Sequence, residues 1–203
     1  LVIASCSGDE KYLTGKDGKE YTQKFTLVTG DTAKIEMEAS LPIKYAREDS
    51  YNVKITTKGE VIAVRMGTTK VYVTNGKDLV YLDVTVNPKY FAYPEPFLEF
   101  GASRSTVKEK YGEPTSEPAN GLIYNDYSET AHIIYFQFED DKLKEVELWA
   151  KADKQDAIEK HLNERFYLYG HNPAPHNDSY YMDALKLDDA TLKVDTRLRD
   201  DYL

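Results

Sequence analysis

The sequence predicts two domains, an all-β sandwich followed by an α+β domain with an antiparallel sheet. From residue 21 to residue 88, apolar and polar side chains alternate with the two-residue period of half-buried strands. After residue 100 the period changes, and two helical segments interleave with short strands in the order α-β-β-β-α-β-β. The composition is that of a folded chain, since 41% of the 203 residues are hydrophobic and 30% are charged.

Four stretches of the first domain have the alternation of strands. Their apolar positions are Ile35, Met37 and Ala39, then Val53 and Ile55, then Val71 and Val73, and finally Leu82, Val84 and Val86. Asn75-Gly76 lies between the last two stretches and predicts a hairpin, because both residues tolerate positive φ. Six or seven short strands with frequent turns predict an immunoglobulin-like (Ig-like) β-sandwich over residues 21–88.

Residues 59–73 contain a Gly, an apolar pair, Gly67-Thr68 and an alternating strand. With Gly30-Asp31-Thr32 before it and residues 84–88 after it, this stretch resembles bacterial Ig-like group 2 domains. The resemblance covers residues 22–88, and Tyr45 stands where that family usually has a Trp. It implies a spacer or adhesion role outside the cytoplasm, with no catalytic residues to transfer.

Residues 89–100 are predicted to form a semi-rigid hinge, because prolines stiffen a segment rich in aromatic residues. In the domain that follows, residues 101–203, Ser103 is expected to cap a helix that Gly112 ends. Asp140-Asp141 predicts a hairpin turn between strands 132–138 and 143–149.

A second helix is expected to begin at the N-cap Asp153 and to end at Gly170. Its apolar stripe consists of Ala157, Ile158, Leu162, Phe166 and Tyr169. Strands over residues 180–185 and 192–198 close the chain.

The opening of this second domain resembles the SmpA/OmlA-like small outer-membrane lipoproteins, a shape shared with β-lactamase-inhibitor-type modules. The resemblance rests on Gly101-Ala102-Ser103, Val107, the run Tyr111-Gly112-Glu113-Pro114, and the hairpin of residues 135–143. It covers residues 101–150 and implies protein–protein binding in the cell envelope.

The single cysteine, Cys6, follows a short apolar run that ends in two small residues. Ile3-Ala4-Ser5-Cys6 resembles the lipobox of bacterial lipoproteins, in which the thiol is acylated and cleavage leaves the cysteine first. The alternative is an incidental cysteine. The resemblance implies a membrane anchor at Cys6, and residues 7–20 are then a flexible tether. The small and acidic run of residues 7–10 resembles an export signal of Gram-negative surface lipoproteins.

Composition and motifs exclude several classes of function. A net charge of −9 without a basic run disfavours nucleic acid. No catalytic motif is present, so we expect neither an enzyme nor a cofactor. His171 and His176 with Asp178 present one alternative, a zinc site, although a solvated proline-rich loop explains them better.

Aromatic side chains are the remaining candidates for ligand contacts. Exposed aromatic rings can stack on sugar rings or anchor a protein partner. The candidates are Trp149, Tyr167, Tyr180 and Tyr181.

The leading hypothesis is a lipid-anchored protein at the outer membrane or cell surface of a Gram-negative bacterium. The Ig-like domain would be a stalk, and the α+β domain would bind a surface glycan or an envelope protein. One alternative is an envelope assembly or inhibitor module. Another is an enzyme with an unrecognised site in residues 101–203.

Overall fold

Strands make up most of the secondary structure in the computed structural model, which describes residues 13–15, 24–172 and 178–197. The predominance of strands predicted from the sequence is confirmed. The chain divides into two compact units, Leu1–Lys89 and Tyr90–Leu203. No helix in the described residues is both long and apolar enough to cross a membrane.

The first unit contains a four-stranded sheet in the order β2-β9-β8-β5 and a three-stranded sheet in the order β3-β7-β6. β2 pairs with β9 in parallel, and the other pairs of these two sheets are antiparallel. A short pair, β1 and β4, makes a third sheet. The strands are β1 Thr14–Gly15, β2 Phe25–Val28, β3 Thr32–Lys34, β4 Met37–Glu38, β5 Lys44–Arg47, β6 Val53–Ile55, β7 Glu60–Ala63, β8 Gly67–Thr74 and β9 Leu79–Asn87.

One apolar core joins the two larger sheets, as the alternation predicted. Val53 and Val61 from one sheet and Val71 and Val84 from the other are fully buried. Two sheets that share one core in this way are a β-sandwich. Gly59 is required beside this core, because its φ is +79° and a Cβ would lie 2.7 Å from the ring of Tyr45.

Two details of the first unit differ from the sequence prediction. The strand expected through Ile35, Met37 and Ala39 is broken into β3 and β4, although Ile35 is buried. In the β8–β9 hairpin only Gly76 has positive φ. The side chain of Asn75 instead accepts the backbone N–H groups of Lys77 and Asp78, which makes a longer turn.

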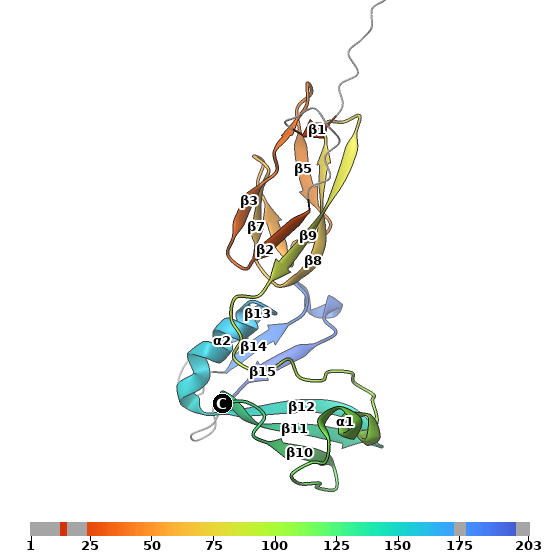
Figure 1. Cartoon of the computed structure of the whole chain (residues 1–203), viewed down its shortest axis with the longest axis vertical. Coiled ribbons are helices and arrows are strands. Elements are labelled where there is room, and N and C mark those ends of the chain that lie inside the picture. Colours follow the sequence, from red (N-terminus) through yellow and green to blue (C-terminus); the bar gives the residue numbers. More distant parts are fainter. Residues whose placement is uncertain (1–12, 16–23, 173–177, 198–203) are drawn as a thin grey trace, which may run out of the picture. The chain divides into compact units, whose positions relative to one another are not determined.

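The second unit repeats one arrangement twice, a helix followed by three antiparallel strands (Figure 1). The strands are antiparallel as predicted, but they form two separate sheets instead of one. There are six strands instead of five, because residues expected to extend the second helix form an additional strand. The elements are α1 Arg104–Tyr111, β10 Gly121–Asn125, β11 Ala131–Glu139, β12 Lys142–Ala150, α2 Gln155–Asn163, β13 Tyr167–His171, β14 Ser179–Met182 and β15 Lys193–Thr196.

The first helix and the following hairpin form as their local chemistry predicts. The hydroxyl of Ser103 accepts the N–H of Thr106, and Gly112 ends α1 with φ +80°. Asp140 and Asp141 both have positive φ, which is the turn geometry that matches the twist of two paired strands.

The second helix is shorter than expected. α2 ends at Asn163, and its N-cap is Lys154, not Asp153. Ala157, assigned to the apolar stripe, is exposed, whereas Ile158 and Leu162 are buried. Residues 167–171 leave the helix because they pair with β14.

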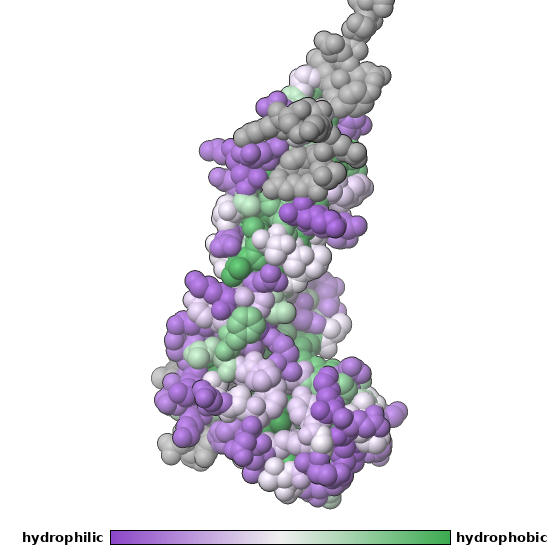
Figure 2. All heavy atoms as spheres, viewed as in Figure 1, coloured by the Kyte–Doolittle hydropathy of each residue, from purple (hydrophilic) through white to green (hydrophobic). Residues whose placement is uncertain are grey.

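The surface agrees with a composition in which 30% of the residues are charged. On the face shown in Figure 2, hydrophilic residues predominate, and apolar side chains lie between them. Large apolar groups that are exposed in the second unit include Phe91 and Trp149.

Candidate functional site

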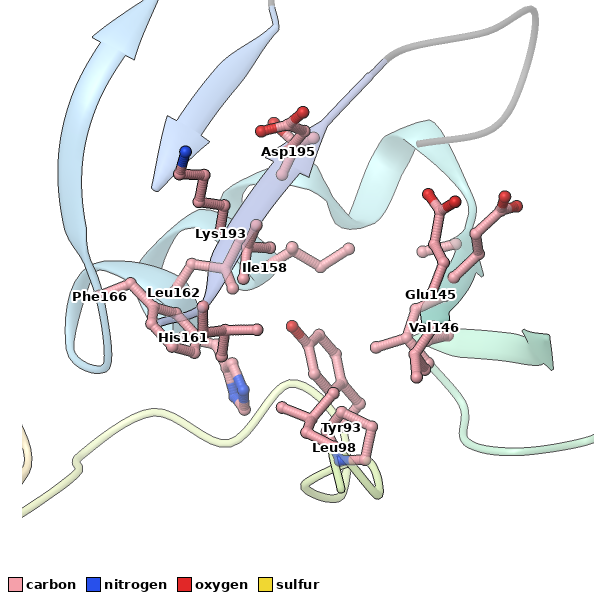
Figure 3. A pocket seen from close by; sticks show the side chains of 18 of the residues that line it. Tyr93, Leu98, Glu145, Val146, Ile158, His161, Leu162, Phe166, Lys193 and Asp195 are labelled. Atoms are coloured by element: carbon pink, nitrogen blue, oxygen red, sulfur yellow. The ribbon is translucent and has the colours of Figure 1, made fainter. Parts of the chain in front are cut away.

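A cleft of about 570 Å³ lies within the second unit, between the last strands of its two sheets (Figure 3). β12 supplies one wall, and β15 supplies the wall opposite. α2 and the segment that precedes α1 close the base. A volume of this size is within the range of protein ligand sites.

The interior of the cleft is apolar because α2 at its base and the two wall strands all turn apolar side chains into it. Ile158 and Leu162 are four positions apart on α2 and therefore share one helix face. Val146 and Leu148 come from β12, and Val194 comes from β15. These three strand residues are only half-buried, so a bound partner would remove further apolar surface from water.

Charged side chains of both signs surround the apolar base. In Figure 3, Lys193 and Asp195 on β15 lie across the opening from Glu145 on β12. Lys144 and Arg197 also line the cleft. Because the signs are mixed, the rim suits a partner with polar groups of both signs better than a purely anionic or cationic one.

Trp149 is the predicted contact residue that lines this cleft. Its side chain is 42% exposed, and its indole N–H donates to the Oε2 atom of Glu147 over 3.0 Å. The other carboxylate oxygen of Glu147 accepts the amide of Gln137. These contacts hold the indole in place and leave part of its ring available to a partner.

The three predicted tyrosines do not line the cleft. Tyr181 is 1% exposed and packs in the core, so its expected role as a contact residue is wrong. Burial raises the pKa of its hydroxyl to about 12. Tyr167 and Tyr180 are half-buried on β13 and β14, and Tyr180 accepts the side-chain amide of Asn172.

The zinc alternative gains no support from the described residues. The Nδ1 atom of His171 lies 3.0 Å from the hydroxyl of Ser179. His176 lies outside the described residues, as does Cys6. Within the part of the chain that the structure describes, no three His, Cys, Asp or Glu side chains gather as metal ligands would.

A polar cluster at the base of the cleft was missed from the sequence. Arg165, which is 5% exposed, donates to the Oε1 atom of Glu95 over 2.5 Å and to the carbonyl of Tyr90 over 3.1 Å. The backbone N–H of Ala92 donates to the Nδ1 atom of His161 over 3.2 Å. Residues about 70 positions apart thus hold the segment predicted as a hinge against α2.

His161 is neutral at physiological pH. Burial is the larger cause and the neighbouring guanidinium of Arg165 the smaller one, and together they lower its pKa to about 4. Its ring lies 4.2 Å from the ring of Tyr93, centroid to centroid. Since Nδ1 accepts a hydrogen bond, the proton of the neutral ring lies on Nε2. The imidazole therefore serves to hold the chain at the base of the cleft.

Two features of the sequence are consistent with this cluster, although they did not predict it. His161 lies one position before the apolar Leu162, near the buried helix stripe, and the prolines of residues 88–96 hold a chain extended. Neither signal says which residues meet, because the contact is between distant segments.

No protein-family model matches the chain, and no curated protein matches it. A bacterial Ig-like domain containing GH10 xylanase from termite gut is similar in structure, with 18% identity and a TM-score of 0.31 over 43% of this chain and 23% of that one.

Two structures of the surface layer protein SbsC are also similar, each with 10% identity and a TM-score of 0.28. The match to domains 4–9 covers 87% of this chain and 30% of the SbsC chain. The match to domains 5–6 covers 92% of this chain and 97% of the SbsC chain. This chain thus spans under a third of the xylanase chain and of the longer SbsC structure. Because none of these TM-scores reaches 0.5, the β-sandwich assignment rests on the strand pairing and shared core described above.

Proposed function

We propose that this chain is a lipid-anchored binding protein of the bacterial cell envelope, and that the cleft in residues 90–203 is its binding site. The observation that carries the proposal is the cleft itself, an apolar base within a rim of mixed charge. Such a combination gives a partner area to bury and polar groups that orient it. The β-sandwich is then the spacer between the anchor and the cleft.

Trp149 offers a direct test of the binding site. Its truncation to Ala in the full chain removes an exposed ring beside the cleft and should weaken binding at least about tenfold, as an aromatic anchor does. Tyr81, which is 57% exposed in the first unit, provides the matched control Tyr81→Ala. Binding is measured on a glycan array and by crosslinking to purified envelope proteins. Equal weakening by both substitutions would contradict this location of the site.

The proposed location in the cell rests on the lipobox-like Ile3-Ala4-Ser5-Cys6. Two or more acyl chains at Cys6 make membrane binding stable, whereas one chain gives only marginal binding. We predict that Cys6→Ala, produced with a native signal peptide in a Gram-negative host, moves the protein from the membrane to the soluble fraction. Mass spectrometry of the unsubstituted protein should show an acylated N-terminal cysteine. An unmodified thiol in that experiment would remove the anchor from the proposal.

A further inference from the structure

The two strands that form the walls of the cleft are both edge strands. β12 is the last strand of the sheet β10-β11-β12, and β15 is the last strand of the sheet β13-β14-β15. On the outer side of β12, Leu143 bonds to Gly101 and Ala102. Elsewhere along an edge strand, alternate residues turn their N–H and C=O groups toward the open side. The register of each sheet shows which residues these are.

In β12, Val146 and Leu148 turn their backbone groups away from β11. The N–H of Phe138 on β11 donates to the carbonyl of Asn120, so the backbone groups of Phe138 point away from β12. The residues two and four positions before it have the same orientation, and they are paired with Val146 and Leu148. In an antiparallel ladder, both members of such a pair point outward.

In β15, Lys193 and Asp195 turn their backbone groups away from β14. The N–H of Asp183 donates to the carbonyl of Leu192 over 3.2 Å, so Asp183 points toward the β15 side. The residue two positions before Asp183 points the same way and is paired with Val194. Val194 therefore bonds to β14, and its two neighbours face the cleft.

Four outward-facing residues thus lie on the two walls of one cleft, Val146 and Leu148 opposite Lys193 and Asp195. Among residues 13–15, 24–172 and 178–197, no other backbone group hydrogen-bonds to their N–H or C=O groups. Each edge repeats its donors and acceptors every second residue, at a spacing of about 6.8 Å along the strand.

We propose that the cleft binds one extended peptide segment of a partner protein, which adds a strand between β12 and β15 and joins the two sheets. This inference rests on the function proposed above and names the chemical class of the partner. A polypeptide backbone carries donors and acceptors at the spacing that both edges present, and in an extended segment successive residues bond to opposite neighbours. A glycan has no such repeat.

The side chains around the cleft define the peptide further. One face of the added strand would lie on Ile158 and Leu162, which requires an apolar residue at every second position. The positions between them face the rim, where Glu145 is available to a basic residue and Lys193 to an acidic one. The expected segment therefore alternates β-branched apolar residues with charged or hydroxyl residues.

Amide hydrogen exchange in the full chain tests the free edges. The amides of Val146, Leu148, Lys193 and Asp195 should exchange quickly, whereas those of Glu147 and Val194, which face their own sheets, should exchange slowly. Protection of the first four amides in the free chain would mean that a segment of the chain already occupies the edges, and would overturn the proposal.

Binding is tested with a library of acetylated and amidated nine-residue peptides, in which Val, Ile or Thr alternates with Lys, Glu or Thr. A binding peptide should shift the fluorescence of Trp149, the single tryptophan, and should protect the four edge amides. The same peptide with N-methyl groups on alternate residues should not bind, because it has lost the donors for one edge.

A matched pair of variants separates the backbone from the side chain. Lys193 is exposed and is the first residue of β15, a position where an edge strand accepts proline. Lys193→Pro and Lys193→Ala both lose the charge, but only the proline loses the outward N–H. The Kd for the peptide should be at least about five times higher for the proline variant.

Three results would overturn the proposal, namely no binding by any peptide in the library, equal Kd values for the two variants, or peptide binding without protection of the edge amides. Binding of an oligosaccharide such as cellohexaose or chitohexaose, without peptide binding, would also overturn it. That last result would still leave the proposed binding function in place.

Discussion

Burial of His161 makes the stability of the second unit depend on pH. Its pKa is about 4 in the folded chain, against an ordinary value of 6.5. The folded state therefore binds a proton less readily than the unfolded state, and stability falls as the pH drops from 6.5 toward 4. The groups that face the ring are the guanidinium of Arg165, the ring of Tyr93 and the Oε1 atom of Glu95, 4.0 Å from Nε2.

The size of this effect follows from the two pKa values. His161 lowers the free energy of unfolding by RT ln[(1 + 10^(6.5 − pH))/(1 + 10^(4 − pH))]. This loss is well under about 1 kcal/mol at pH 7 and about 2 kcal/mol at pH 5. The side chain is 1% exposed, so solvent screening does not reduce this figure. At pH values below 4 the loss approaches about 3 kcal/mol.

Urea denaturation followed by Trp149 fluorescence measures this loss, because the single tryptophan lies in the second unit. The matched variant is His161→Asn, because the side-chain oxygen of Asn takes the place of Nδ1 and can accept the N–H of Ala92. The free energy of unfolding of the natural chain should fall by about 2 kcal/mol more than that of the variant between pH 7 and pH 5. Equal losses in the two proteins would refute the reasoning, since His161 would then accept a proton in the folded state without cost.

Two further predictions concern the backbone of the second unit. A Cβ at Gly121 would lie 2.7 Å from the carbonyl oxygen of Phe136, so Gly121→Ala should reduce the free energy of unfolding by about 1–3 kcal/mol. A Cβ at Gly170 would lie 3.4 Å from its nearest neighbour, so Gly170→Ala should change this free energy by under about 0.5 kcal/mol. The same urea experiment measures both. Asp141 has a positive φ of 58°, so Asp141→Gly should raise the thermal midpoint by relieving this strain. Asp141→Ala loses the same exposed ion pair to Arg104 but keeps the strain, so it should not raise the midpoint. A gain in both Asp141 variants would assign the effect to the lost charge.

Local chemistry was enough to predict many of the elements. Ser103 and Gly112 mark the ends of α1, and alternation around Val53 and Val71 predicted β6 and β8. These features depend on a residue and its near neighbours, which the sequence states directly.

Segments whose structure depends on distant partners were predicted less well. The stripe through Phe166 and Tyr169 is compatible with a helix, but β14 pairs with residues 167–171 and the helix ends before them. Pairing satisfies backbone groups along a whole strand, and this outweighs the small helix propensity of a few residues.

The sequence by itself determined the alternation, the caps and turns, the net charge of −9 and the presence of one cysteine in a lipobox-like run. Only the tertiary structure decided that Glu95 meets Arg165, that Tyr181 is buried while Trp149 borders the cleft, and that β12 and β15 end their sheets on opposite sides of it. The physical reason is that caps and alternation are set within a few residues, whereas a cleft forms where chain segments far apart in the sequence come together and leave backbone groups unpaired.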